Sequence, residues 1–220
     1  MIKTKVNLIA GFLGSGKTTV LRNFLAQAVV GEKVAVLVHD LQEMRVTDES
    51  VLDRPDAVTT RLKNGCVVRQ ISKTFSEDLS ALAAMGVDRV LIEASGSADP
   101  GRFLNTLLEN NLIQQYRVEP TIVVVDVSAF TRLSIKLAYQ YIMHIKAGDI
   151  LLLNKTDQVP ADELNRIARD LKALNPRAFQ MDTARGRLDL IGVLEGKAPP
   201  AAKDPPAGPH FEYCTVLSSG

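Results

Sequence analysis

Short apolar runs alternate with amphipathic stretches along most of this chain. The runs are rich in Val, Ile and Leu and cover residues 6–10, 34–38, 90–93, 122–125 and 150–153. Because they lack a regular alternation of apolar and polar positions, they are typical of strands buried on both faces, as in a parallel sheet. The pattern predicts an α/β fold with a mostly parallel β-sheet and helices on both faces.

Helical spacing of apolar residues predicts the elements between these strands. Helices are expected over residues 20–28, with Gly31 at the end, over 75–85, and along a stripe of Leu133, Leu137, Tyr141 and Ile145. Residues 164–174 predict another helix, residues 178–181 a short last strand, and residues 58–62 a possible strand in a less legible region.

The chain of 220 residues is long enough for one domain with a short appendage. We expect residues 1–195 to form this domain. Residues 196–209 hold five of the ten prolines, which is the composition of an extended linker. Residues 210–220 are expected to form a terminal strand or the stub of a C-terminal domain.

The composition favours an enzyme or a switch of the cytoplasm. A formal net charge of +1 gives no long-range attraction to nucleic acid or to acidic membranes. No apolar stretch is long enough to span a bilayer, and the first residues lack the succession typical of a signal peptide. The two cysteines, Cys66 and Cys214, lie far apart, which favours a reducing compartment over a disulfide framework.

Residues 11–19, with the sequence GFLGSGKTT, match the phosphate-binding template G-x-x-x-x-G-K-[ST] between the first predicted strand and a helix. This arrangement turns backbone N–H groups and the positive end of the helix toward one anion. Lys17 is then expected to reach the β and γ phosphates, and the Thr18 hydroxyl to bind Mg²⁺. An ordinary glycine-rich turn is the alternative. The expected nucleotide contacts are Gly11, Gly14, Ser15, Gly16, Lys17, Thr18 and Thr19.

Two further strands lead into polar residues at their carboxyl ends, where ligands of open α/β sheets bind. The group His39, Asp40 and Glu43 follows the second strand, and a solvated loop is the alternative for His39 and Glu43. Glu93 ends the third strand, three residues before Gly96. Downstream of a phosphate-binding loop, we expect Glu93 to hold a Mg²⁺ water or to orient the attacking water. The Gly96 N–H is expected to bond the γ-phosphate.

Asn154-Lys155-Thr156-Asp157 follows the fifth strand. A carboxylate at Asp157 can accept hydrogen bonds from both N1–H and the 2-amino group of guanine, two donors that adenine does not present together. Asn154 and the aliphatic stem of Lys155 can support the ring. A carboxylate left unpaired by the wrong base is costly, so such a site is selective. A turn with a helix cap is the alternative. The loop at Ala184 could place a backbone N–H near guanine O6.

The order of these motifs resembles the CobW-type family of metal-chaperone GTPases, whose relatives include the nickel-insertion GTPases of urease and hydrogenase maturation. The resemblance covers roughly residues 4–195 and is carried by GFLGSGKTT, NGC, IEASGSADP, VVVD, LLLNKTD and LNPRA. It implies a P-loop NTPase fold, Mg²⁺-dependent hydrolysis of GTP to GDP, and delivery of a metal ion or cofactor to a client protein. By this resemblance, Lys17 and Thr18 are the phosphate and Mg²⁺ residues, Glu93 and Gly96 the γ-phosphate sensor, and Asn154, Lys155 and Asp157 the base-specificity element.

The sequence departs from the family pattern at two places. Residues 39–43 read HDLQE where the family usually has Asn-Glu-x-Gly-Glu, and residues 66–69 read CVVR where it has Cys-x-Cys-Cys. One thiolate cannot form a closed site for a soft metal. Cys66 stays a candidate ligand for Zn²⁺, Ni²⁺ or Co²⁺, together with His39 or a dimer mate's residues. A buried, inert cysteine is the alternative.

The leading hypothesis is a GTP-hydrolysing switch that assists a client metalloenzyme or cofactor-dependent enzyme. In it, Lys17 and Mg²⁺ neutralise phosphate charge, and Asp40 or Glu93 places the Mg²⁺ waters and the attacking water. Because no positioned arginine is evident, we expect slow turnover that a partner or a nucleotide-dependent homodimer raises. A non-hydrolysing guanine-nucleotide regulatory module and a P-loop kinase for a small metabolite are the other hypotheses.

Overall fold

The computed structural model describes residues 3–28, 32–38, 57–59, 71–109, 112–130, 135–186 and 188–194. Several predictions lie outside these residues: Gly31, the polar group His39, Asp40 and Glu43, the candidate ligand Cys66, the proline-rich linker over 196–209 and the segment 210–220.

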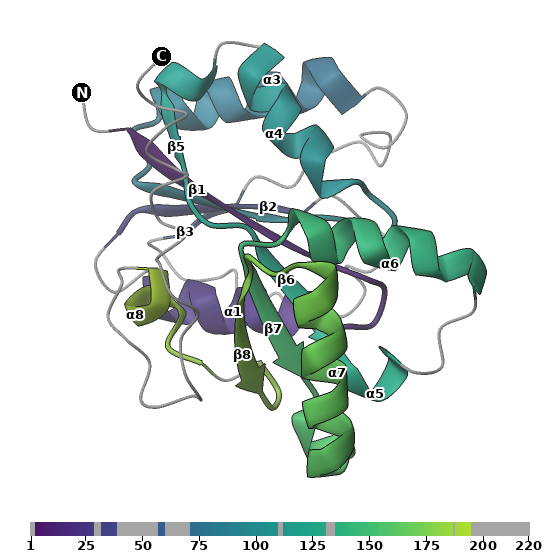
Figure 1. Ribbon diagram of the computed structural model, residues 1–220. Coiled ribbons are helices and arrows are strands. Elements are labelled where there is room, and N and C mark those ends of the chain that lie inside the picture. The colour runs from purple at the N-terminus through teal and green to yellow at the C-terminus, as the bar shows by residue number, and fades with distance from the viewer. Residues whose placement is uncertain are drawn as a thin grey trace.

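Eight strands form one sheet (Figure 1). They are β1 (Thr4–Gly11), β2 (Val34–Val38), β3 (Ala57–Thr59), β4 (Arg89–Glu93), β5 (Tyr116–Val118), β6 (Ile122–Asp126), β7 (Ile150–Asn154) and β8 (Phe179–Thr183). The order is β3-β2-β4-β1-β6-β7-β8, and the short β5 pairs with the first half of β1. Every pairing between described strands is parallel, so all strands end at the same edge of the sheet.

Helices cover both faces of the sheet, as predicted (Figure 1). On one face lie α1 (Lys17–Ala28) and α8 (Leu190–Leu194); on the other lie α3 (Ile71–Ala84), α4 (Pro100–Glu109), α6 (Ile135–Ala147) and α7 (Ala161–Leu174). Alternate residues of β1 show the division, because Leu8 belongs to the core under α3, α4, α6 and α7, whereas Ile9 packs with Phe24 of α1. Three short helices complete the described chain: η2 (Leu112–Gln114), α5 (Val127–Phe130) and η3 (Thr156–Gln158).

The five buried strands predicted from apolar runs are all present, within two residues of their expected bounds. The helix expected over 75–85 begins four residues earlier, at Ile71, and Tyr141 and Ile145 of the predicted stripe are buried in the core. The elements β5, α4 and α8 were not predicted, and neither were the short helices η2, α5 and η3. The sequence does hold a signal for the start of α4, because Asp99, a residue type common at helix N-termini, precedes Pro100. In the structure the Asp99 carboxylate accepts a hydrogen bond from the Gly101 N–H at 2.9 Å. No helix in the described part of the chain combines the length and apolar character needed to cross a bilayer.

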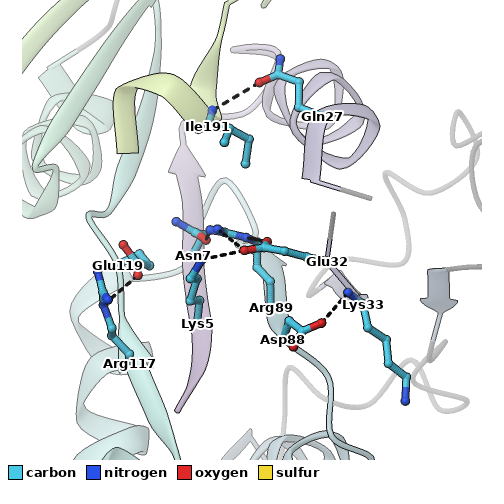
Figure 2. Close-up of polar contacts among 10 residues, drawn as sticks. All are labelled: Lys5, Asn7, Gln27, Glu32, Lys33, Asp88, Arg89, Arg117, Glu119 and Ile191. Atoms are coloured by element: carbon cyan, nitrogen blue, oxygen red, sulfur yellow. Dashed lines mark hydrogen bonds and ion pairs between the residues drawn. The ribbon is translucent and has the colours of Figure 1, made fainter. Parts of the chain in front are cut away.

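A cluster of charged residues closes the amino end of the sheet, where Lys5 of β1 lies in register with Arg89 of β4 (Figure 2). The Arg89 side chain is buried, donates hydrogen bonds to the Glu32 carboxylate and to Asn7 Oδ1, and stacks over the Phe24 ring at 5.5 Å. Lys5 Nζ lies 2.6 Å from Glu32 Oε1. Two cations therefore share one carboxylate beneath the core.

The shared carboxylate makes stability depend on pH. Burial alone would raise the pKa of Glu32, but the hydrogen bonds and positive charges of Arg89 and Lys5 outweigh it and hold the pKa below its ordinary value of 4.5. Because the pKa is lowered in the folded state, the ionised carboxylate stabilises the fold above the unfolded-state pKa. That contribution is lost as the pH falls through the folded-state pKa.

We predict that Glu32→Gln lowers the free energy of unfolding by about 2–3 kcal/mol at neutral pH, because Arg89 is left buried without a carboxylate. The difference in the free energy of unfolding between the variant and wild type becomes smaller in acid, where the wild-type carboxylate is itself protonated. Urea unfolding at neutral pH and near pH 3 measures both effects.

The control is Glu163→Gln on α7, whose contact with Arg166 is long, at 4.0 Å, and exposed. It is expected to cost under about 0.5 kcal/mol. Equal losses in the two variants would contradict the role of Glu32.

Candidate nucleotide-binding site

The phosphate-binding loop, residues 11–19, leaves the carboxyl end of β1 and enters α1. Gly11, Gly14 and Gly16 have φ of 140°, 73° and 103°, a region that residues with a side chain rarely adopt. Space is restricted too, since a Cβ at Gly11 would overlap the Val124 carbonyl oxygen and one at Gly16 the Asn154 amide. These glycines are therefore required by the path of the loop.

Lys17 and Thr18 begin α1 and connect the loop to the sheet. The Lys17 side chain is 2% exposed, and its Nζ donates a hydrogen bond to the Phe12 carbonyl at 3.1 Å, which folds it over the loop. The Thr18 hydroxyl donates to Glu93 Oε1 at 2.7 Å. The structure thus brings together the predicted phosphate residue and both described candidates for the Mg²⁺ site, while Thr19 is exposed beside them.

Residues 94–100 run from the end of β4 to the start of α4 and pack against the phosphate-binding loop; we name them the switch segment because they hold Gly96 of the predicted γ-phosphate sensor. Gly96 is buried, and a Cβ there would lie 2.7 Å from Leu13 N and 3.2 Å from Phe12 C. Both neighbours are backbone atoms, which cannot rotate away as a side chain can. Glycine at position 96 therefore lets the switch segment lie directly on the loop.

Asn154 joins three segments, a role that sequence reasoning missed. Its amide Nδ2 donates to the Ser15 carbonyl at 2.9 Å, and its Oδ1 accepts from the Gly186 N–H at 3.2 Å. The residue is 3% exposed, so both bonds are shielded from water. Asn154 thereby fixes the phosphate-binding loop relative to the end of β7 and the loop after β8.

Lys155 and Asp157 lie on the outer side of this junction. Lys155 adopts a left-handed conformation, with φ of 64°, and its Nζ lies 2.6 Å from Asp126 Oδ2 at the end of β6. Burial alone would raise the pKa of Asp126, but hydrogen bonds from Lys155 and Ser128 outweigh it and hold the pKa below its ordinary range. The ionised Asp126 therefore holds the lysine stem in place. Asp157 is exposed in η3, and within the described residues no hydrogen bond or ion pair engages its carboxylate.

Ala184 is exposed in the loop that follows β8, where the base-recognition prediction puts it. Asn23 of α1 holds the next part of this loop, because its amide donates to the Gly186 carbonyl at 2.7 Å. The loop is therefore anchored on both sides, by Asn23 and by Asn154. Asp40 and Cys66, the remaining candidates, lie outside the described residues. Within the described residues no group of three or more His, Cys, Asp and Glu side chains is placed to hold a metal ion.

The comparison with known proteins places this arrangement in a family. The model of the CobW/HypB/UreG nucleotide-binding domain matches residues 5–181. The chain belongs to this family. The predicted family and the P-loop fold are therefore both confirmed.

Individual members of the CobW/HypB/UreG family show the same relationship. The zinc chaperone YjiA of Escherichia coli is 32% identical over 203 residues, which cover 86% of this chain and 60% of YjiA. The zinc-regulated GTPase metalloprotein activator 1 of Schizosaccharomyces pombe is 26% identical over 197 residues, or 86% of this chain and 48% of the relative. The chain therefore spans about half to three fifths of the length of these curated relatives.

Solved structures agree on the fold. The crystal structure of Zn(II)-bound YjiA GTPase from Escherichia coli superposes with a TM-score of 0.63 at 26% identity, covering 98% of this chain and 70% of that one. FtsY from Mycoplasma mycoides superposes with a TM-score of 0.59 at 18% identity, covering 99% of this chain and 68% of that one. The likeness to FtsY concerns the fold alone.

We predict that Gly96→Ala slows GTP hydrolysis at least about tenfold while GDP binding changes less than about threefold. The added methyl group would overlap the backbone of Leu13 and Phe12, so the switch segment must move away from the phosphate-binding loop, whose own geometry is kept. Phosphate release and the affinity for a fluorescent GDP analogue measure the two effects.

The matched control is Gly101→Ala in the first turn of α4, where a methyl group meets only the Asp99 side chain, at 3.2 Å. This variant is expected to hydrolyse GTP within about twofold of wild type. Equal activity of Gly96→Ala and Gly101→Ala would show that close packing of the switch segment on the loop is not needed for hydrolysis.

Proposed function

We propose that this chain is a Mg²⁺-dependent GTPase that hydrolyses GTP to GDP and phosphate and assists metal or cofactor delivery to a client enzyme. The observation that carries the proposal is the junction at Asn154. There the phosphate-binding loop and the Asn154–Asp157 edge are joined by the hydrogen bond from Asn154 Nδ2 to the Ser15 carbonyl. The residues that we propose to bind the phosphates and those that we propose to recognise the base thus lie on one edge of one sheet.

Different residues have different roles in the proposed hydrolysis. The loop N–H groups and the Lys17 ammonium bind the β and γ phosphates and neutralise charge that grows on them in the transition state. Glu93 orients the attacking water, and the Gly96 N–H bonds the γ-phosphate when it is present. Gly14, Ser15, Gly16 and Thr19 complete the phosphate contacts.

The donor set at the start of α1 fits Mg²⁺. The Thr18 hydroxyl and the Glu93 carboxylate lie 2.7 Å apart, and both offer the hard oxygen ligands that Mg²⁺ prefers. Thr18 would hold the ion directly, and Glu93 or Asp40 through water. When bound, Mg²⁺ would supply further neutralisation of the phosphate charge.

Guanine is recognised, in this proposal, by the residues that follow β7 and β8. The Asp157 carboxylate accepts hydrogen bonds from N1–H and the 2-amino group, and the Lys155 stem, held by Asp126, covers the ring face. The Ala184 N–H donates to O6. Adenine leaves the carboxylate unpaired, which is the source of selectivity.

The client, the cargo and the location belong to the proposal as well. YjiA and CobW are named zinc chaperones, so Zn²⁺ is the first cargo to consider, ahead of Ni²⁺ and Co²⁺, with Cys66 as one candidate ligand. The partner is a metalloenzyme or cofactor-dependent enzyme, and a nucleotide-dependent homodimer or that client raises the slow intrinsic rate. We propose the cytoplasm as the location, since two cysteines that lie far apart in sequence favour a reducing compartment.

The test of GTPase activity is phosphate release by purified wild type and Lys17→Ala with Mg²⁺ and GTP. We expect the substitution to lower the rate at least about 100-fold, because the charge that stabilises the transition state is lost. Lys172→Ala on α7, whose Nζ bonds only the Ala178 carbonyl among the described contacts, is the matched control and is expected to keep the wild-type rate. If wild type binds GTP but releases phosphate no faster than Lys17→Ala, the chain is instead a non-hydrolysing regulatory module.

If Asp157 recognises the base, Asp157→Asn is expected to change the nucleotide preference from GDP toward xanthosine diphosphate. The amide can accept from N1–H through its oxygen but presents a donor toward position 2, where guanine also has a donor and xanthine has a carbonyl. We therefore expect the affinity for GDP to fall at least about tenfold and the affinity for xanthosine diphosphate to rise by a similar factor. Competition against a fluorescent nucleotide measures both. Unchanged preference for GDP would remove Asp157 from the base site.

A further inference from the structure

Thr156, the third residue of the Asn154–Asp157 edge, connects the two loops at which the base is proposed to bind. It begins η3 just after β7 and is half-buried. Its hydroxyl does not cap its own helix but donates a hydrogen bond to the Thr183 carbonyl, at 3.2 Å, at the end of β8. Since β7 and β8 pair in parallel with Asn154 in register with Thr183, the Thr156 side chain reaches from one loop to the start of the other.

The carbonyl that accepts this hydrogen bond belongs to the same peptide unit as the Ala184 N–H. A trans peptide unit is planar, and its C=O and N–H bonds point in opposite directions. The described ranges of the chain contain no cis peptide bond. By fixing the direction of the Thr183 carbonyl, the Thr156 hydroxyl therefore also fixes the direction of the Ala184 N–H, which points away from Thr156.

The loop that follows β8 is also held after Ala184. Asn23 of α1 donates from Nδ2 to the Gly186 carbonyl at 2.7 Å and to the Arg185 carbonyl at 3.3 Å. The Gly186 N–H donates to Asn154 Oδ1 at 3.2 Å. Arg185 and Gly186 have φ of 56° and 62°, and two successive residues with positive φ are typical of a tight turn. The backbone of Ala184 thus lies between anchored neighbours on both sides.

The Ala184 N–H is available to a ligand. Ala184 is exposed, and within the described residues no hydrogen bond engages its N–H. At position 6, guanine presents the acceptor O6, whereas adenine presents an amino group, which is a donor. An N–H held in a fixed direction can pair with the first and not with the second. The orientation of one peptide unit can therefore contribute to the choice between the two bases.

We propose that Thr156 is a positioning residue for base selectivity, which orients the Ala184 N–H toward O6 of guanine through the Thr183 carbonyl. It acts at position 6 of the base, whereas Asp157 is proposed to read N1–H and the 2-amino group. The inference rests on the proposed guanine specificity of the site.

The experiment compares Thr156→Val, which removes the hydroxyl with little change of shape, and Thr156→Ser, which keeps it. Three diphosphates that share ribose and phosphates probe the base. GDP carries O6 and the 2-amino group, inosine diphosphate keeps O6 and lacks the 2-amino group, and 2-aminopurine riboside diphosphate keeps the 2-amino group and lacks O6. Competition against a fluorescent GDP analogue with Mg²⁺ measures each affinity.

We expect Thr156→Val to lower the affinities for GDP and for inosine diphosphate about fivefold each, because both bases use O6. The affinity of this variant for 2-aminopurine riboside diphosphate is expected to stay within about twofold of wild type, because that base has no O6 to lose. Thr156→Ser keeps the donor and is expected to bind all three ligands within about twofold of wild type. A loss of packing alone would lower the three affinities alike.

Three results would overturn the assignment. No loss of affinity in Thr156→Val, or an equal loss for all three diphosphates, would make Thr156 a residue without a role at O6. A loss for GDP and 2-aminopurine riboside diphosphate that spares inosine diphosphate would mean that the substitution acts through Asp157. If Thr156→Val does not fold, judged by circular dichroism, Thr156→Ala also lacks the hydroxyl and is held to the same expectations.

Failure of the proposed function is recognised separately. If wild type binds GDP no more tightly than ADP, the guanine specificity fails first, and the role of Thr156 fails with it. If wild type prefers GDP and only the Thr156 variants depart from expectation, the specificity stands and the assignment of Thr156 alone is wrong.

Discussion

The parallel pairing of the strands is the constraint on which the rest of the structure depends. Because β1, β4, β6 and β7 run in one direction in adjacent positions, their carboxyl ends lie along one edge, and each end leads into a polar segment. The phosphate-binding loop and the switch segment follow β1 and β4, and Asp126 and Asn154 are the last residues of β6 and β7. Right-handed crossovers through helices are the usual way to connect such strands, which explains why the helices occupy both faces and leave this edge clear.

Charged residues have different roles at the two ends of the sheet. At the amino end, Arg89 and Lys5 share the Glu32 carboxylate, and this cluster closes the core. At the carboxyl end, the pairs Thr18–Glu93 and Lys155–Asp126 hold functional side chains in position while Asp157 faces solvent. Contacts to a carboxylate therefore stabilise the fold at one end of the sheet and position the side chains of the candidate site at the other.

Much of the fold and of the site could be predicted from the sequence, because both leave local signals. Buried strands appear as runs of apolar residues, and G-x-x-x-x-G-K-T and N-K-x-D are short strings with a fixed chemical purpose. The role of Asn154 as a connector could not be predicted, since it depends on a partner far away in sequence, the Ser15 carbonyl. The short elements β5 and α8 were missed for a related reason: a few residues carry no periodicity, and their conformation is set by tertiary packing. The nucleotide, Mg²⁺ and metal-binding roles of the candidate residues, Asp40 and Cys66 among them, remain predictions.

One edge of the sheet is proposed to bind a guanine nucleotide through the phosphate-binding loop and the Asn154–Asp157 edge. Isothermal titration of the purified chain with GDP and with ADP, both with Mg²⁺, tests it most directly, because the two ligands share the phosphates and differ only in the base. We expect GDP to bind at least about 100-fold more tightly than ADP, since adenine leaves the Asp157 carboxylate unpaired. Equal affinity for the two nucleotides would contradict it.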